Sequence, residues 1–216
     1  MRLSALSFNK DILKKMSKGY VKTYIVLPGT IYGLASGPLV DSGLQNSRSS
    51  QIPRLIKLSL DRGRAGMVGQ GKNIWPNVHI TEGKATNPIE WTSSSFFKLA
   101  ADLYILLLDL VISQNHNCQT KNPLFAHGAA GFYFCENGEH ELASVSESIG
   151  KAMVALGRTT NSIPTPFTEQ EYKKYPGLSG LGTNSRCRAD RSKGIGWNPS
   201  MTTKDMLASI KQEMIQ

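Results

Sequence analysis

Apolar residues gather in short runs along parts of the chain, and these runs predict strands. Residues 23–27 read Thr-Tyr-Ile-Val-Leu, apolar or β-branched without alternation, which is typical of a strand buried on both faces in a parallel sheet. Residues 131–136, Gly-Phe-Tyr-Phe-Cys-Glu, have the same character. Shorter runs predict strands over residues 66–68 and 77–80.

Elsewhere the apolar residues recur at helical spacing. A helix is predicted to begin near Pro53 and to end at Gly63. Its packed face would consist of Ile52, Leu55, Ile56, Leu58 and Leu60. Residues 100–113 are apolar on nearly every side, so we expect this helix to lie between layers. Residues 9–18 have the character of a helix end that Gly19 stops.

Two capping-box patterns predict further helix starts. Ser144 is followed three residues later by Glu147, and Thr168 is followed in the same way by Glu171. The first of these helices would end at Gly157.

The order of the predicted elements favours an α/β fold. A last helix is expected from residue 202 or 203 onwards, and residues 33–46 are glycine- and serine-rich and predict a loop. Strands and helices alternate along most of the chain, which is the pattern of a mainly parallel sheet covered by helices.

Composition limits the kinds of partner. The chain has 216 residues, of which 40% are hydrophobic, so it can bury a core. Its formal net charge is +9, and residues 1–108 carry 14 basic against 6 acidic side chains. A basic protein raises nucleic acid as a partner, but no basic and aromatic residues interleave and no nucleic-acid module is present. We therefore expect no nucleic-acid partner.

Membrane and disulfide chemistry are also not indicated. The longest apolar run, residues 103–112, contains Asp109 and is far shorter than the roughly 20 residues that span a bilayer. Cys118, Cys135 and Cys187 form no C-x-x-C pair and are odd in number. We expect no membrane partner, no metal site, and a reducing compartment, the cytoplasm.

Glycine-rich and arginine-rich segments offer weak signals for phosphate binding. Residues 69–74 and 177–182 do not lead from a strand into a helix, so both are predicted to be ordinary turns. The basic cluster of Arg186, Arg188, Arg191 and Lys193 leaves two interpretations open, a phosphate-binding group or a solvated basic turn.

Three segments in order resemble the extended short-chain dehydrogenase/reductases. Residues 24–33, Tyr-Ile-Val-Leu-Pro-Gly-Thr-Ile-Tyr-Gly, are similar to the family's strand, proline and Tyr-Gly segment. Residues 78–80 with 101–104 are similar to its Val-His-Val-Asp-Asp-Leu-Ala phrase, and residues 196–199, Gly-Trp-Asn-Pro, to its closing signature. The resemblance is to the C-terminal half of the epimerase/dehydratase-like group, especially its fungal NAD(P)-binding members.

This resemblance implies a Rossmann-type parallel sheet, here a partial one that lacks its N-terminal nucleotide-binding half, with a small C-terminal α+β substrate lobe. It implies NAD or NADP as cofactor and a small carbonyl or sugar-like molecule as substrate. Pro28, Gly29 and Thr30 would approach the nicotinamide end of the cofactor. Tyr32 and His79 would lie near the substrate.

The chain departs from the family pattern in its catalytic motifs. The Gly-x-x-Gly-x-x-Gly turn that docks the pyrophosphate is absent, and no Tyr is followed by Lys in a Tyr-x-x-x-Lys pair. That family needs a Tyr whose pKa is lowered by the Lys to exchange a proton with its substrate. We therefore predict no catalytic residue in this chain and weak or absent cofactor binding.

Residues 81–100 interrupt a strand-to-helix phrase that the family runs continuously. We interpret them as an insertion, with the hypothesis that they derive from non-coding sequence. The resulting domain prediction places the remnant of the sheet and the start of the substrate lobe in residues 1–80. The remaining helices, a strand and the rest of the lobe fall in residues 101–216.

Taken together, the sequence predicts an NAD(P)-dependent oxidoreductase or epimerase-like protein, truncated and weakly active or inactive as this chain. Whether it is an enzyme is left open by the missing motifs. The alternative is a non-catalytic interaction module derived from the same fold, in which exposed apolar surface would support a homo-oligomer.

Overall fold

Parallel strand pairs form the centre of the molecule. The computed structural model describes residues 21–80, 100–116 and 122–215. Strand β1 (Ile25–Pro28) pairs in parallel with β5 (Phe132–Cys135). Strand β2 (Thr30–Tyr32) pairs in parallel with β4 (Ile74–His79), which β6 (Glu139–Glu141) joins on its other side in antiparallel orientation. A third, short parallel pair links β3 (Gly66–Met67) to β7 (Thr165–Pro166).

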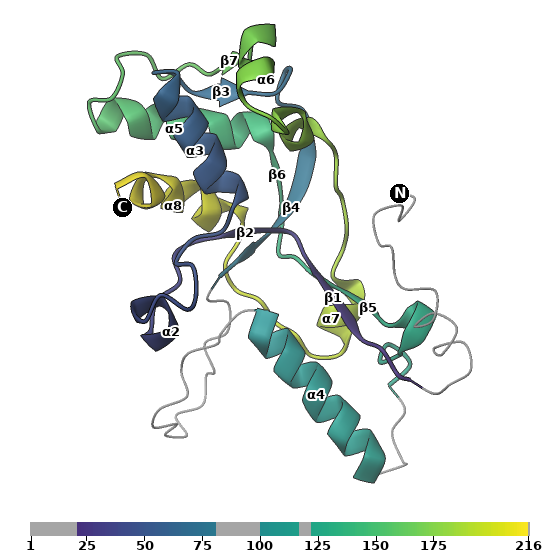
Figure 1. Ribbon diagram of the computed structural model, residues 1–216. Helices are drawn as coiled ribbons and strands as arrows, with labels where there is room; N and C mark the ends of the chain where they lie inside the picture. Colours follow the sequence, from purple (N-terminus) through teal and green to yellow (C-terminus); the bar gives the residue numbers. More distant parts are fainter. Residues whose placement is uncertain (1–20, 81–99, 117–121, 216) are drawn as a thin grey trace.

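Helices surround these strands (Figure 1). They are α2 (Pro38–Asp41), α3 (Gln51–Asp61), α4 (Ala100–His116), α5 (Leu142–Ala155), α6 (Glu169–Lys174), α7 (Asp190–Gly194) and α8 (Thr203–Ile215), with short 3₁₀ turns η1 (Gly128–Ala130) and η2 (Leu178–Gly182).

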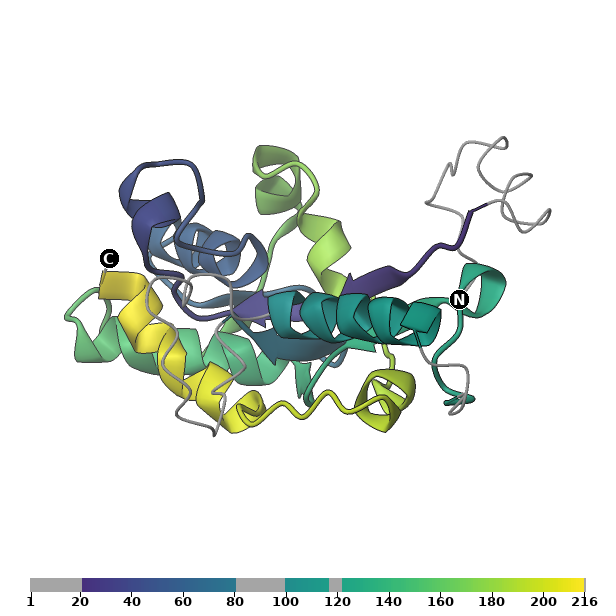
Figure 2. The same ribbon diagram turned by 90° about the horizontal axis from the view of Figure 1, so that it is seen from below.

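Two apolar clusters hold the elements together. In the first, Tyr32 of β2 packs among buried residues of α3, α5 and α8, such as Leu55, Ile149 and Met206. In the second, Val26 and Tyr133 of the β1–β5 pair pack with residues of α4 and with Trp197. Figures 1 and 2 show α4 lying alongside β1, while α3, α5 and α8 gather around the other sheet.

The α/β class and most of the predicted elements are confirmed. The apolar runs at residues 23–27 and 131–136 form β1 and β5, and they pair in parallel as expected. The predicted helix after residue 52 is α3, and the last helix begins at Thr203. The predicted loop at residues 33–46 contains one short helix, α2. The predicted helix end at residues 9–18 and nearly all of the predicted insertion lie outside the described residues.

The prediction that the apolar helix would lie between layers is wrong for one side of α4. Leu103 and Leu107 are buried against the β1–β5 pair, with exposures of 0% and 4%. On the other side, Tyr104, Ile105 and Leu108 are 51%, 51% and 57% exposed. The physical reason is that no described element packs on this outer side.

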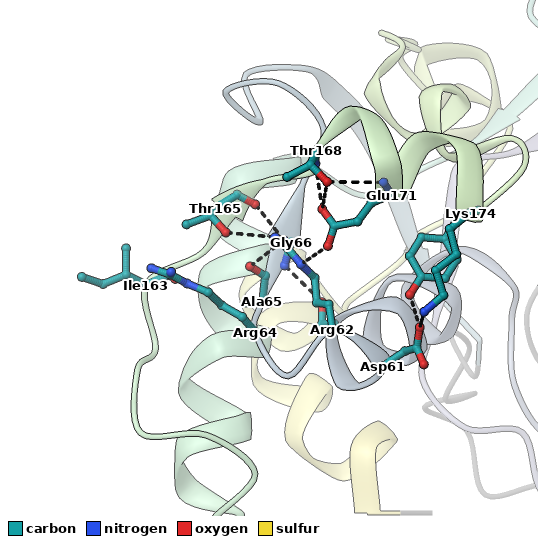
Figure 3. Close-up of polar contacts among 12 residues, drawn as sticks. Asp61, Arg62, Arg64, Ala65, Gly66, Ile163, Thr165, Thr168, Glu171 and Lys174 are labelled. Atoms are coloured by element: carbon teal, nitrogen blue, oxygen red, sulfur yellow. Dashed lines mark hydrogen bonds and ion pairs between the residues drawn. The ribbon is translucent and has the colours of Figure 1, made fainter.

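One of the two predicted capping boxes is wrong and the other is confirmed. Helix α5 begins at Leu142, directly after β6, so Ser144 lies inside its first turn instead of capping it. At α6, the Thr168 hydroxyl accepts from the Glu171 N–H at 3.3 Å, and the Glu171 carboxylate accepts from the Thr168 N–H at 2.7 Å. Figure 3 shows this reciprocal pair.

Within the described ranges, none of the helices combines the length and the apolar character that crossing a bilayer requires.

Candidate functional site

One face of the β2–β4–β6 sheet carries polar and aromatic side chains. Thr30 lies opposite Asn77, and Tyr32 lies opposite His79, in the β2–β4 register. Because residues opposite each other in neighbouring strands point to the same face, these side chains form one row. Trp75 and His140, opposite each other in the β4–β6 pair, extend it.

The two residues predicted to lie near the substrate are in contact. The Tyr32 and His79 rings pack edge to face with centroids 4.9 Å apart. Tyr32 is fully buried, and its hydroxyl donates to the Thr202 carbonyl at 2.9 Å. His79 is half-buried; burial lowers the pKa of its imidazole, and the Asp205 carboxylate acts in the opposite direction. Both residues lie at the carboxyl ends of parallel strands, where α/β proteins bind ligands.

Gly33 closes this end of the sheet tightly over His79. Its φ of +89° falls in the left-handed region that favours glycine, and a Cβ at this position would lie 2.5 Å from the His79 Nε2. A side chain at position 33 would therefore displace the imidazole.

The three residues predicted to approach the cofactor are consecutive but differ in accessibility. Pro28 is exposed at the end of β1. The Gly29 N–H donates to the Cys135 carbonyl at 3.0 Å, and a Cβ on Gly29 would lie 2.7 Å from the Pro76 carbonyl group. Thr30 is 2% exposed. Only the Pro28 side chain is thus open to a large ligand.

Thr30 lines a small cavity with four further polar or aromatic side chains, Gln51, Asn73, Trp75 and His140. The remaining wall is mainly apolar and comes from Ile52, Leu55, Leu142, Val145 and Leu181. The cavity volume is about 30 Å³, enough for a water molecule. Pockets for substrates and cofactors usually exceed roughly 300 Å³. The cavity does not fit a nicotinamide or a sugar, so we derive no catalytic step through a bound dinucleotide.

His140 is the most strongly perturbed histidine of the row. Burial lowers the pKa of its imidazole to about 4, so the ring is neutral at pH 7. The His140 Nδ1 lies 3.3 Å from the Asn77 Oδ1, and because an amide oxygen can only accept, the neutral ring donates from Nδ1. The Thr203 hydroxyl lies 2.9 Å from the same oxygen.

A buried carboxylate lies at the carboxyl end of β2. Glu213 is 1% exposed, and its Oε1 accepts from the Gly33 N–H at 3.1 Å. Its Oε2 has no hydrogen-bond partner among the residues that the structure describes. Burial raises the pKa of this carboxyl group, with the hydrogen bond from Gly33 opposing the change.

The arginine cluster is engaged with the protein itself. The Arg186 guanidinium forms a two-point ion pair with the Glu139 carboxylate, with a shortest distance of 2.6 Å. Arg188 pairs with Asp190 at 2.9 Å, and Arg191 donates to the Ala130 carbonyl. The contacts favour a structural role for this cluster over a phosphate-binding one.

Sequence reasoning missed His140, Asn77 and Glu213. Strand β6, Glu-His-Glu, is short and polar, so it was not predicted, and neither was its pairing with β4. Glu213 follows Lys211 and Gln212 in the sequence, so it is expected to be an exposed residue of the last helix. The alternation of residues 139–141 was the one local signal that could have placed His140 facing inwards.

Comparison with known proteins gives remote relatives. No model of a protein family matches the chain. A curated relative, oxidase ucsJ from Acremonium sp, is 26% identical over 182 residues, which cover 83% of this chain and 46% of the relative. The chain therefore spans about half the length of this relative.

The solved structures to which the chain is similar are also about twice its length. PbgP3 from Burkholderia pseudomallei matches 94% of this chain and 49% of its own, with 13% identity and a TM-score of 0.49. A UDP-glucose 4-epimerase from Bifidobacterium longum, in complex with NAD⁺ and UDP, matches 95% and 52%, with 16% identity and a TM-score of 0.49. DesIV from Streptomyces venezuelae, a dTDP-glucose 4,6-dehydratase with NAD and TYD bound, matches 93% and 46%, with 15% identity and a TM-score of 0.47.

Proposed function

We propose that the chain is the substrate-side part of an NAD(P)-dependent oxidoreductase or epimerase-like protein that acts on a carbonyl or sugar-like small molecule in the cytoplasm. The observation that carries this proposal is the parallel pairing of β2 with β4. It brings Tyr32 and His79 side by side at the carboxyl ends of their strands, the edge where open α/β sheets bind ligands.

His79 is the residue through which this edge would bind a substrate. Its lowered pKa keeps the imidazole neutral at pH 7, so a ring nitrogen can accept a hydrogen bond from a sugar hydroxyl. Tyr32 supports the His79 ring by edge-to-face packing, while its own hydroxyl is engaged with Thr202. Tyr32 therefore orients His79 and does not exchange protons.

The cofactor contact would be limited to a short edge. Pro28 and the Gly29 backbone lie at the end of β1 and would meet the nicotinamide end of NAD or NADP, with Thr30 behind them. With no pyrophosphate turn and no Tyr-x-x-x-Lys pair in the sequence, binding would be weak and the chain by itself inactive or weakly active.

A titration with UDP-glucose, followed by two-dimensional NMR of the backbone amides, tests the substrate site. Saturable shifts are expected at Gly33, His79 and Ile80, with a His79→Ala variant at least about fivefold weaker in affinity. His127→Ala serves as the matched control because His127 is an exposed histidine away from this edge. Shifts that are absent, or that His79→Ala leaves unchanged, would contradict the proposal.

The second candidate function is a non-catalytic interaction module. The apolar outer side of α4 supports it, since Ile105, Leu108 and Ile112 are about half exposed along one helix. We infer that this side of α4 mediates self-association of the chain into a homo-oligomer. This form of association can be tested with the chain alone.

A further inference from the structure

A groove between α3 and α6 has the size and charge of a ligand site. Its volume is about 440 Å³, within the range of pockets that hold small molecules. Arg54 and Lys57 reach it from α3, and Lys174 reaches it from the end of α6. None of these residues lines the cavity beside Thr30, so the groove is separate from the candidate site.

The helices that wall the groove are fixed to each other by polar contacts (Figure 3). Arg62, just after α3, forms an ion pair of 2.7 Å with Glu171 of α6, and both side chains are largely buried. The Arg62 guanidinium also donates to the Thr165 carbonyl at 3.1 Å and lies over the Phe167 ring, 4.9 Å from its centroid. The groove is therefore built on a fixed framework instead of on independent surface side chains.

The charges in the groove do not balance. Among the described residues, Asp61 is the only acidic one in its wall. Its carboxylate lies 2.6 Å from the Lys174 ammonium and accepts from the Tyr175 hydroxyl. These two hydrogen bonds lower the pKa of Asp61, and the charges of Lys174 and Lys57 lower it further. Arg54, Lys57 and Lys174 therefore face one described carboxylate, which leaves the wall with two more positive than negative charges. Lys57 attracts the Asp61 carboxylate electrostatically, but neither Arg54 nor Lys57 makes a salt bridge with a described carboxylate.

Arg54 is held in place and keeps free donors. One of its terminal N–H groups donates to the Pro176 carbonyl, which fixes the guanidinium at the rim of the groove. A guanidinium has five N–H donors, so the others remain for an anion. Lys57 lies one helical turn after Arg54, on the same side of α3.

The rest of the wall is apolar. Leu58 comes from α3, and Tyr175 and Pro176 follow α6. These side chains offer apolar surface next to Arg54 and Lys57. An inorganic anion has no apolar part that could pack against this surface.

We propose that this groove binds a small organic dianion, with a phosphate monoester as the chemical class that fits best. Its phosphate would accept hydrogen bonds from Arg54 and Lys57, and its organic part would lie against Leu58, Tyr175 and Pro176. The excess of two positive charges in the wall matches the charge of a phosphate monoester at pH 7.

Binding of phenyl phosphate to the chain, measured by calorimetry at low ionic strength, tests this proposal. A dissociation constant below about 1 mM is expected, with weaker binding of inorganic phosphate and a loss of affinity on adding salt. The double variant R54Q/K57Q should bind at least about tenfold more weakly. The matched control K151Q removes an exposed helix lysine elsewhere and should bind like the parent chain.

Substitutions of exposed residues rarely lower the free energy of unfolding by more than about 0.5 kcal/mol, so the variants should fold. Thermal melts of the variants check this. Failure to saturate with phenyl phosphate would overturn the proposal, as would equal loss in R54Q/K57Q and K151Q. Equal affinity for phenyl phosphate and inorganic phosphate would overturn the role of the apolar wall. These results are separate from the UDP-glucose titration, which reports on Gly33, His79 and Ile80.

Discussion

The His140 imidazole and the Asn77 amide meet across the β4–β6 pair, with the His140 Nδ1 3.3 Å from the Asn77 Oδ1. This contact joins the short polar strand β6 to the strand that carries His79. It also fixes which nitrogen of the neutral His140 ring carries the proton.

The pH dependence of stability follows from the His140 environment. Its folded-state pKa is about 4, below the unfolded value of 6.5, so between these values the unfolded chain binds a proton that the folded chain does not. The free energy of unfolding should therefore fall as pH drops from about 6.5 to about 4, by about 3 kcal/mol in total. Urea denaturation of wild type and His140→Gln at several pH values measures this contribution. Parallel pH curves for the two proteins would rule it out.

Glu213 should show the opposite dependence. Its pKa is higher in the folded chain than in the unfolded chain, so the folded chain holds this proton more tightly. The stability that results is present below the unfolded-state pKa, and it is lost as the pH rises through the folded-state pKa. Glu213→Gln keeps an acceptor for the Gly33 N–H and removes the buried charge. We expect it to raise the free energy of unfolding at pH 8 by about 1 kcal/mol and to have less effect at pH 4. Glu147→Gln, on the exposed side of α5, is the control; a Glu213→Gln variant that is destabilised equally at both pH values would refute this account.

Gly29 is predicted to be intolerant of a side chain. An alanine Cβ would lie 2.7 Å from the Pro76 carbonyl carbon and oxygen, so β1 or β4 must shift. Gly29→Ala should lower the free energy of unfolding by about 1 to 3 kcal/mol. At Gly180 a Cβ would meet nothing within 4 Å, so Gly180→Ala should change stability by less than about 0.5 kcal/mol. Chemical denaturation of both variants tests the difference, and equal stabilities would show that the approach of Gly29 to Pro76 is not tight.

The outer side of α4 gives a prediction about association. Leu108 is 57% exposed in an apolar row, and burying such a side chain contributes about 1.5 to 3 kcal/mol. If this row mediates self-association, light scattering should give a mass above that of the monomer, and Leu108→Glu should weaken association at least about tenfold. Val154→Glu, at an isolated exposed valine of α5, should leave the mass unchanged. If the parent chain is monomeric at all concentrations, the prediction of a homo-oligomer is wrong.

The elements that the sequence predicted well are those with a local cause. Strands β1 and β5 consist of consecutive apolar residues, and α6 has Thr168 and Glu171 at capping spacing. Such signals depend on neighbours in the chain, but they do not always decide the structure: Ser144 and Glu147 have the same capping spacing, and α5 nevertheless begins at Leu142 because it follows directly on β6.

The features that the sequence did not predict depend on contacts between distant residues. His140 is buried where β6 pairs with β4, a strand some 60 residues earlier in the sequence. Glu213 is buried where its carboxylate accepts a hydrogen bond from the Gly33 N–H, 180 residues away in the sequence. The exposure of one side of α4 depends on which elements pack against it. Tyr32 and His79, which the sequence assigned to one site, are in contact, and their role toward a substrate stays a prediction. The water-sized cavity beside Thr30 had no signal in the sequence.

The most direct test of the account is a fluorescence titration of NADPH and NADH with the chain alone. Thr30 is buried, so the contact with a cofactor would be limited to Pro28 and the Gly29 backbone, and the sequence holds no turn for the pyrophosphate. We expect no saturable change in fluorescence at cofactor concentrations below about 1 mM. A dissociation constant near 1 µM would contradict the account, because it would require a complete dinucleotide site within these residues.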